Sequence, residues 1–165
     1  MKRIVALALC CLLLAGCGRR GKILVEPVYF YYPRNEFDYG TADGVIDYEA
    51  MDGTGWMDNY QLLLSEYFTG PIDEALSDPF PEGTRLLSAD IDGNVFRLTL
   101  SEEPLALPEH LLTLACTCLS MTCFTLTDCA QVTVLCGSRE IAIPRDSWLL
   151  LDRYIPTETA ERNPT

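Results

Sequence analysis

The segment PEHLLTLACTCLSMTCFT, residues 108–125, decides the fold of this chain. Apolar side chains recur in it at intervals of three and four residues, which predicts an α-helix. Pro108 suits the first helical position because its fixed φ is already helical, and Glu109 lies near the positive end of the helix dipole. One apolar face of the predicted helix consists of Leu112, Ala115, Leu119, Cys123 and Leu126.

A second apolar surface covers much of the remainder of this helix: Leu111, Leu114, Cys118 and Met121. A helix that is apolar nearly all round must be covered on more than one side. We expect the first face to pack on a β-sheet, and two covers for the second face remain open. In one, residues 148–151 fold back over it, since intrachain burial is the commoner fate of apolar segments. In the other, a protein partner or a second copy docks on it.

The sequence before this helix favours two strands and a shorter helix. Residues 23–32 are rich in β-branched and aromatic side chains, and residues 45–51 form a weaker strand candidate. Asp58, with Gln61 three residues later, resembles a capping box. Met57 and Leu62 are spaced as a hydrophobic staple. Gly70 and Pro71 supply a left-handed cap and a stop, and the apolar face consists of Tyr60, Leu63, Leu64, Tyr67 and Phe68.

A β-hairpin is predicted at residues 87–100, where apolar and polar side chains alternate on both arms. Its turn is Asp92-Gly93 or Gly93-Asn94, because both pairs tolerate the positive φ of tight hairpin turns. After the long helix, residues 132–136 form a further strand, Gly137 turns the chain, and residues 140–143 return beside it. This order predicts an α+β fold, a small mixed β-sheet with two helices packed on one face.

These pieces, in this order, resemble the sporulation and spore germination (GerMN) domain over roughly residues 28–143. The most specific matches are the Gly-Pro end of the shorter helix and the Pro-x-Gly-Thr of residues 81–84. The resemblance implies a small cell-envelope domain, similar to ring-building modules of sporulation channels and secretion systems, and it carries over no catalytic residue. One departure is the acidic second strand, where Asp47 and Glu49 replace the hydrophobic and basic pattern frequent in the family.

The N-terminus has the pattern of a cleaved leader. Lys2 and Arg3 precede eleven apolar residues, 4–14, whereas a membrane-crossing helix needs about 20. Residues 14–17, Leu-Ala-Gly-Cys, resemble the lipobox of bacterial lipoproteins, which implies a diacylglyceryl group on Cys17 and an extracytoplasmic, membrane-anchored protein. An ordinary secretory leader is the alternative. The predicted divisions are a signal peptide at 1–16, lipidated cysteine and tether at 17–27, the domain at 28–143 and a C-terminal extension at 144–165.

Composition and charge argue against several classes of function. The chain carries a net charge of −12 and no Lys/Arg cluster after Lys22, so nucleic acid and anionic lipid surfaces are poor partners. The single histidine, His110, is expected to be an exposed first-turn residue rather than a general base. Cys-x-x-Cys and His-x-x-x-His spacings are absent from the sequence, and Asp90–Asn94 lacks the closing glutamate of a calcium loop. We therefore expect no catalytic residue, metal or cofactor.

Two function classes remain. The first is a non-enzymatic protein-interaction or assembly module, with Leu111, Leu114, Cys118 and Met121 as the contact face. The second is a ligand- or cation-binding lipoprotein that serves a transporter or a sensor. An apolar helix face favours the first class, and a concave pocket with convergent polar groups favours the second.

Five cysteines follow Cys17, and an exported chain makes disulfides the first hypothesis. Cys116 and Cys123 lie about 10 Å apart by helical rise, beyond the ~7 Å limit between bridged Cα atoms. Only a helix-to-strand bridge satisfies the geometry, and the count is odd. We therefore expect buried free thiols at Cys116, Cys118, Cys123, Cys129 and Cys136.

We predict that Cys17→Ala leaves a chain that takes up no fatty-acid probe, because it removes the sulfur to be acylated. Metabolic labelling followed by detergent partitioning measures the outcome. Cys11→Ala is the matched control, since Cys11 lies inside the apolar run and its loss should leave labelling unchanged. Label retained by Cys17→Ala would contradict the lipoprotein interpretation.

Overall fold

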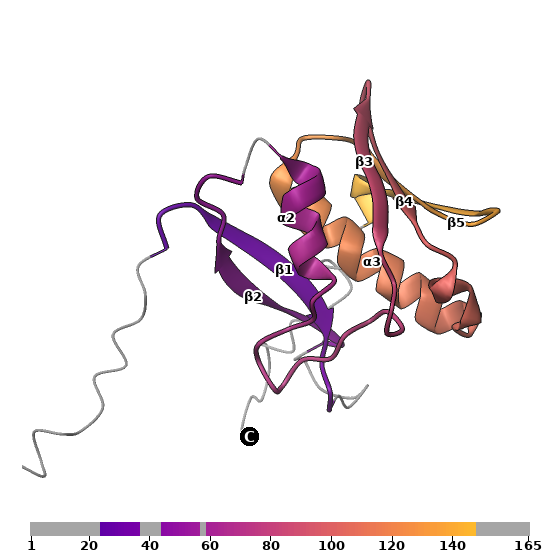
Figure 1. The fold of residues 1–165 in the computed structure, drawn as a ribbon, viewed down its shortest axis with the longest axis horizontal. Helices are drawn as coiled ribbons and strands as arrows, with labels where there is room; N and C mark the ends of the chain where they lie inside the picture. Colours follow the sequence, from indigo (N-terminus) through magenta and orange to yellow (C-terminus); the bar gives the residue numbers. More distant parts are fainter. Residues whose placement is uncertain (1–23, 37–43, 57–58, 148–165) are drawn as a thin grey trace, which may run out of the picture.

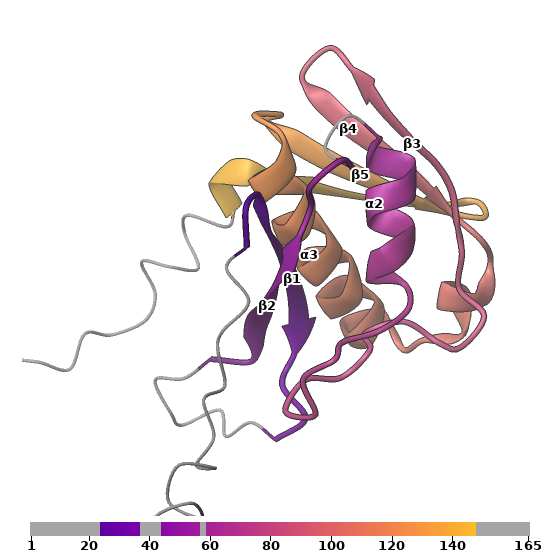
Figure 2. The same cartoon turned by 60° about the vertical axis from the view of Figure 1, so that its left-hand side comes forward.

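The long helix α3 (Glu109–Leu126) lies between two β-sheets, as Figure 1 and Figure 2 show from two sides. The computed structural model describes residues 24–36, 44–56 and 59–147. On one side of α3 is a two-stranded antiparallel ribbon, β1 (Pro27–Pro33) and β2 (Ile46–Asp52). On the other is a four-stranded sheet in the order β3 (Leu86–Asp92), β4 (Val95–Leu100), β5 (Gln131–Cys136) and β6 (Arg139–Pro144).

The four-stranded sheet is mixed, as predicted. Strand β5 pairs parallel with β4, while the β3–β4 and β5–β6 pairs are antiparallel. A parallel pair needs a long crossover, and the 3₁₀ helix Glu103–Ala106 and α3 provide it. The shorter helix α2 (Tyr60–Tyr67) packs on the face that α3 covers, with the Tyr60 ring centroid 5.2 Å from that of Phe96 in β4. The predicted α+β class, with two helices on one face of a mixed sheet, is confirmed.

The ribbon is the second cover of α3, a solution that the sequence analysis did not foresee. Val28, Phe30 and Tyr32 alternate along β1 and are at most 1% exposed, because they face the helix. Tyr31 N donates a hydrogen bond to Thr122 Oγ1 at 3.0 Å, which fixes β1 against α3. The other proposed cover, residues 148–151, lies outside the described residues.

Helix α2 begins one residue later than predicted. Asn59 is the N-cap, and its side-chain oxygen accepts from Leu62 N at 3.0 Å. Gln61 does not complete a capping box, because its amide donates to Leu86 O on β3 instead. Met57 and Asp58, the other predicted capping residues, lie outside the described residues. The predicted left-handed Gly70 is confirmed with φ +86°, and Leu63, Leu64 and Tyr67 form the buried face.

The two ends of α3 are held by different means. Pro108 occupies the N-cap position rather than the first helical one, and its carbonyl accepts from Leu112 N at 2.9 Å. At the other end the Arg145 guanidinium donates to the carbonyls of Phe124, Thr127 and Cys129. It also lies 4.7 Å from the centroid of the Phe124 ring. Arg145 thus satisfies carbonyl groups that a helix terminus leaves without partners.

Helix α3 is a core helix. Its 18 residues and mean hydropathy of 1.3 are sufficient, by length and composition, for a membrane span. Half of it is nevertheless buried inside the domain, and sheets cover it on two sides. The five cysteines at 116–136 are free and buried, as predicted. A thiol hydrogen bond joins Cys116 of α3 and Cys136 of β5. These are therefore a helix cysteine and a strand cysteine that lie next to each other.

We predict that Gly93→Val lowers the free energy of unfolding by about 1–3 kcal/mol, the usual range for local backbone strain. The pairing of Asp92 with Val95 places the turn at Gly93-Asn94, and Gly93 has φ +61°. A Cβ at this position would meet nothing within 4 Å, so the cost comes from the backbone alone. Urea denaturation measures it, with Gly93→Asn as a control that tolerates positive φ. Equal losses for both variants would contradict this explanation.

Candidate functional site

An apolar groove runs beside the N-terminal half of α3. Its cavity volume is about 610 Å³. The walls come from the end of β1, the segment 77–81 and the first turns of α3. Here "the apolar groove" means the cavity whose apolar walls include Pro33, Val45, Phe80, Leu107, Leu111 and Leu114.

The structure divides the predicted contact face. Leu111 is 40% exposed and Leu114 is half-buried, and both line the apolar groove. Cys118 is 0% exposed, so its assignment to the contact face is wrong for this structure. The physical reason is that strand β1 packs against α3, with Tyr31 N hydrogen-bonded to Thr122 one turn after Cys118. Met121 is half-buried and does not line the groove.

Polar side chains also line the apolar groove. Asp78 Oδ1 accepts a hydrogen bond from Phe80 N at 2.9 Å. Burial raises the pKa of the Asp78 carboxyl above its ordinary value, and the hydrogen bond from Phe80 N–H opposes that shift. His110 is exposed, as predicted, and lies at the edge of the groove. The sequence analysis missed Asp78, whose only local signal was the proline that follows it.

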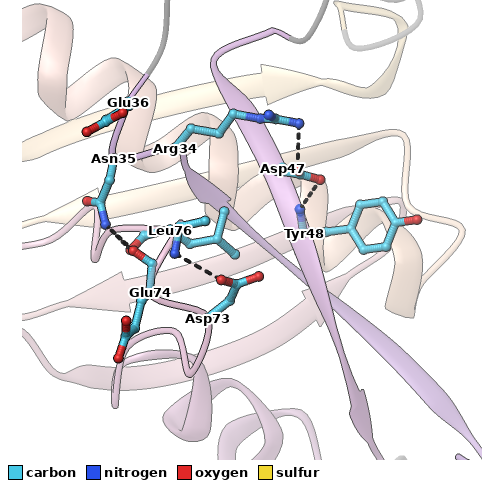
Figure 3. A pocket seen from close by; sticks show the side chains of 9 residues that line it. Arg34, Asn35, Glu36, Asp47, Tyr48, Asp73, Glu74 and Leu76 are labelled. Atoms are coloured by element: carbon cyan, nitrogen blue, oxygen red, sulfur yellow. Dashed lines mark hydrogen bonds and ion pairs between the residues drawn. The ribbon is translucent and has the colours of Figure 1, made fainter. Parts of the chain in front are cut away.

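A second, polar pocket adjoins the groove and shares Arg34 and Asn35 with it. Figure 3 shows the side chains that line this second pocket. Its volume is about 350 Å³. Arg34 Nη2 forms an ion pair with Asp47 Oδ2 at 2.6 Å. The Asn35 amide donates to the carbonyls of Glu74 and Leu76, at 2.7 and 2.9 Å. Because its walls carry the carboxylates Glu36, Asp47, Asp73 and Glu74, we call it the acidic pocket.

The acidic residues of β2 explain why this unusual strand forms. Asp47 is paired with Arg34. Glu49 accepts hydrogen bonds from the backbone N–H groups of Ile72 and Asp73, at 3.0 and 3.2 Å. These contacts attach β2 to the segment that follows α2. The acidic pattern is therefore compatible with a strand, although it departs from the family resemblance.

The remaining groups to consider are possible metal ligands and the buried thiols of α3. In the described ranges no group of three or more His, Cys, Asp or Glu side chains could hold a metal ion. Burial raises the pKa of the Cys118 thiol to about 12, and the thiol hydrogen bond to Cys136 is the main cause that raises the pKa of Cys116. Such thiols are inert as nucleophiles.

The described chain stops short of residues 148–151, the predicted intrachain cover. The described chain ends at residue 147, just after Arg145, which contacts Phe124 in the last turn of α3. The apolar groove lies at the first turns of α3, around Leu111. The last described residues thus lie near the C-terminal end of α3, and the groove lies near its N-terminal end.

Comparison with known proteins gives little similarity. Neither a protein family nor a curated protein matches this chain. One solved structure, described as a "Putative Lipoprotein from Clostridium perfringens", aligns with 75% of this chain and 91% of its own. It is 16% identical, with a TM-score of 0.45. A likeness this weak defines neither the family nor the function, and the GerMN resemblance stays a prediction.

We predict that Asp78→Asn gains stability relative to the wild type as the pH rises from about 3 to 7. A carboxyl whose folded-state pKa is raised holds its proton more tightly in the folded chain. Its contribution to stability is therefore present at low pH and lost as the pH rises through the folded pKa. Urea denaturation at both pH values measures the difference, and an Asn side chain can still accept from Phe80 N. Asp78→Ala should lose that bond at both pH values, and a pH-independent Asp78→Asn difference would contradict the prediction.

Proposed function

We propose that this protein is a lipoprotein of the extracytoplasmic membrane face, anchored through a lipid on Cys17. Its GerMN-like domain acts as a non-enzymatic protein-interaction or assembly module of the cell envelope, with a link to sporulation or germination. The lipobox-like residues 14–17 support the anchor, and the ordered resemblance over residues 28–143 supports the module.

The apolar groove is the observation that carries this proposal. Leu111 is 40% exposed on a helix whose other large apolar side chains are buried or half-buried. Leu114 and Phe80 add apolar wall to the same cavity. Contiguous exposed apolar surface is uncommon on a monomeric domain and usually marks a binding site. A partner side chain seated there would remove Leu111 from water.

The proposed anchor is joined to the described domain by a short segment. The described domain begins at Leu24, seven residues after Cys17. An extended tether of that length spans at most about 25 Å. The net charge of −12 disfavours contact of the domain with anionic lipid. We therefore expect the domain to stand off the membrane surface rather than lie on it.

A second candidate is a ligand-binding lipoprotein that serves a transporter or a sensor. The observation in its favour is the cavity volume of about 610 Å³, since small-molecule sites usually enclose about 300–1,000 Å³. Arg34, Asp78 and His110 provide polar groups among the apolar walls. The groove is partly open to solvent, which favours the protein partner.

We predict that a photo-crosslinking amino acid at Leu111 gives a defined protein adduct in native membranes. The matched control is the same substitution at Leu87, which is 57% exposed on β3, away from the groove. An adduct of twice the chain's mass identifies a second copy, and any other defined mass identifies a different protein. Identical patterns at both positions, or none, would contradict the proposal. A small molecule that copurifies with the wild type and is lost from Leu114→Trp would favour the ligand-binding candidate.

A further inference from the structure

The apolar groove and the acidic pocket form one continuous surface, because Arg34 and Asn35 line both. Negative charges outnumber positive charges along this surface. Arg34 is neutralised by Asp47 at 2.6 Å. The carboxylates of Glu36, Asp73 and Glu74 remain beside that neutral pair, and Asp78 lies at the groove wall.

We infer that this surface binds a protein segment in which an apolar anchor is adjacent to lysine or arginine side chains. The inference rests on the proposed function and specifies its partner. The anchor lies in the apolar groove against Leu111, Leu114 and Phe80. The basic side chains extend over the acidic pocket toward Glu36 and Glu74.

The two parts of the surface match the two kinds of side chain in such a segment. The groove, at about 610 Å³, is the larger cavity and has the apolar walls. The acidic pocket, at about 350 Å³, has room for the long stems of Lys or Arg, which pack on apolar atoms while the charged head stays in water. Apolar burial supplies most of the affinity, and the charges supply orientation and association rate.

Charge also decides against the other occupants. A second copy of this chain would carry a net charge of −12 to a surface that is itself acidic, and like charges oppose such docking. An anionic lipid headgroup meets the same repulsion at Glu36, Asp73 and Glu74. A basic protein segment is the occupant whose charge complements the carboxylates.

Selection from a random peptide library, displayed against the full lipidated chain in detergent micelles, tests the inference. We expect the enriched peptides to place apolar residues next to Lys or Arg. Leu111→Asp should raise their Kd about tenfold or more, which is 1.4 kcal/mol. The double variant Glu36→Gln/Glu74→Gln should raise it about threefold and reduce its dependence on salt.

Matched controls place the same changes elsewhere. Leu87→Asp alters an exposed leucine on β3, and Asp90→Asn/Glu140→Gln neutralises two exposed carboxylates of β3 and β6. Neither control should change Kd, and a thermal melt of each variant confirms that it folds. Selected peptides that are apolar but not basic, and that remain sensitive to Leu111→Asp, would overturn this inference and leave the proposed function intact. If none of the selected peptides loses affinity on Leu111→Asp, both this inference and the proposed function are overturned.

Discussion

The structure depends on one constraint, which is that α3 is apolar on two sides and both must be kept from water. The four-stranded sheet covers one side, with Val132 and Val134 of β5 fully buried. The β1–β2 ribbon covers the other. A two-stranded ribbon is only marginally stable by itself, so the ribbon depends on the helix as much as the helix depends on the ribbon. The hydrogen bond from Tyr31 N to Thr122 Oγ1 joins the two directly.

The apolar groove lies where the β1–β2 ribbon no longer covers α3. Strand β1 ends at Pro33, and Pro33 itself lines the groove beside the first turns of α3. Beyond this point the segment 77–81 forms the opposite wall, with Phe80 as its largest apolar side chain. A loop carries its own polar groups and packs less closely than a strand. Leu111 is consequently left partly exposed where Leu112, on the sheet side, is 1% exposed.

The acidic residues have two roles that the overall charge does not distinguish. Asp47 and Glu49 hold the ribbon in place through Arg34 and through the backbone N–H groups of residues 72–73. Glu36 and Glu74 instead line the rim of a pocket and are exposed. The first pair therefore belongs to the fold, and the second pair carries the charge complementarity on which the proposed partner depends.

The sequence by itself determined the local elements. The three-and-four spacing of residues 108–125 predicted α3 to within one residue at each end, and Gly93 marked the β3–β4 turn. These features depend on backbone φ and on neighbours within one helical turn, and both can be read from a short stretch of chain. Tertiary structure alone decided that the first strands form a separate ribbon, and that Cys118 is buried while Leu111 is exposed. It also placed Asp78 in the groove and made Asn59 the cap of α2. Each of these outcomes depends on which distant segment covers a given side chain, and periodicity along the chain does not record that contact.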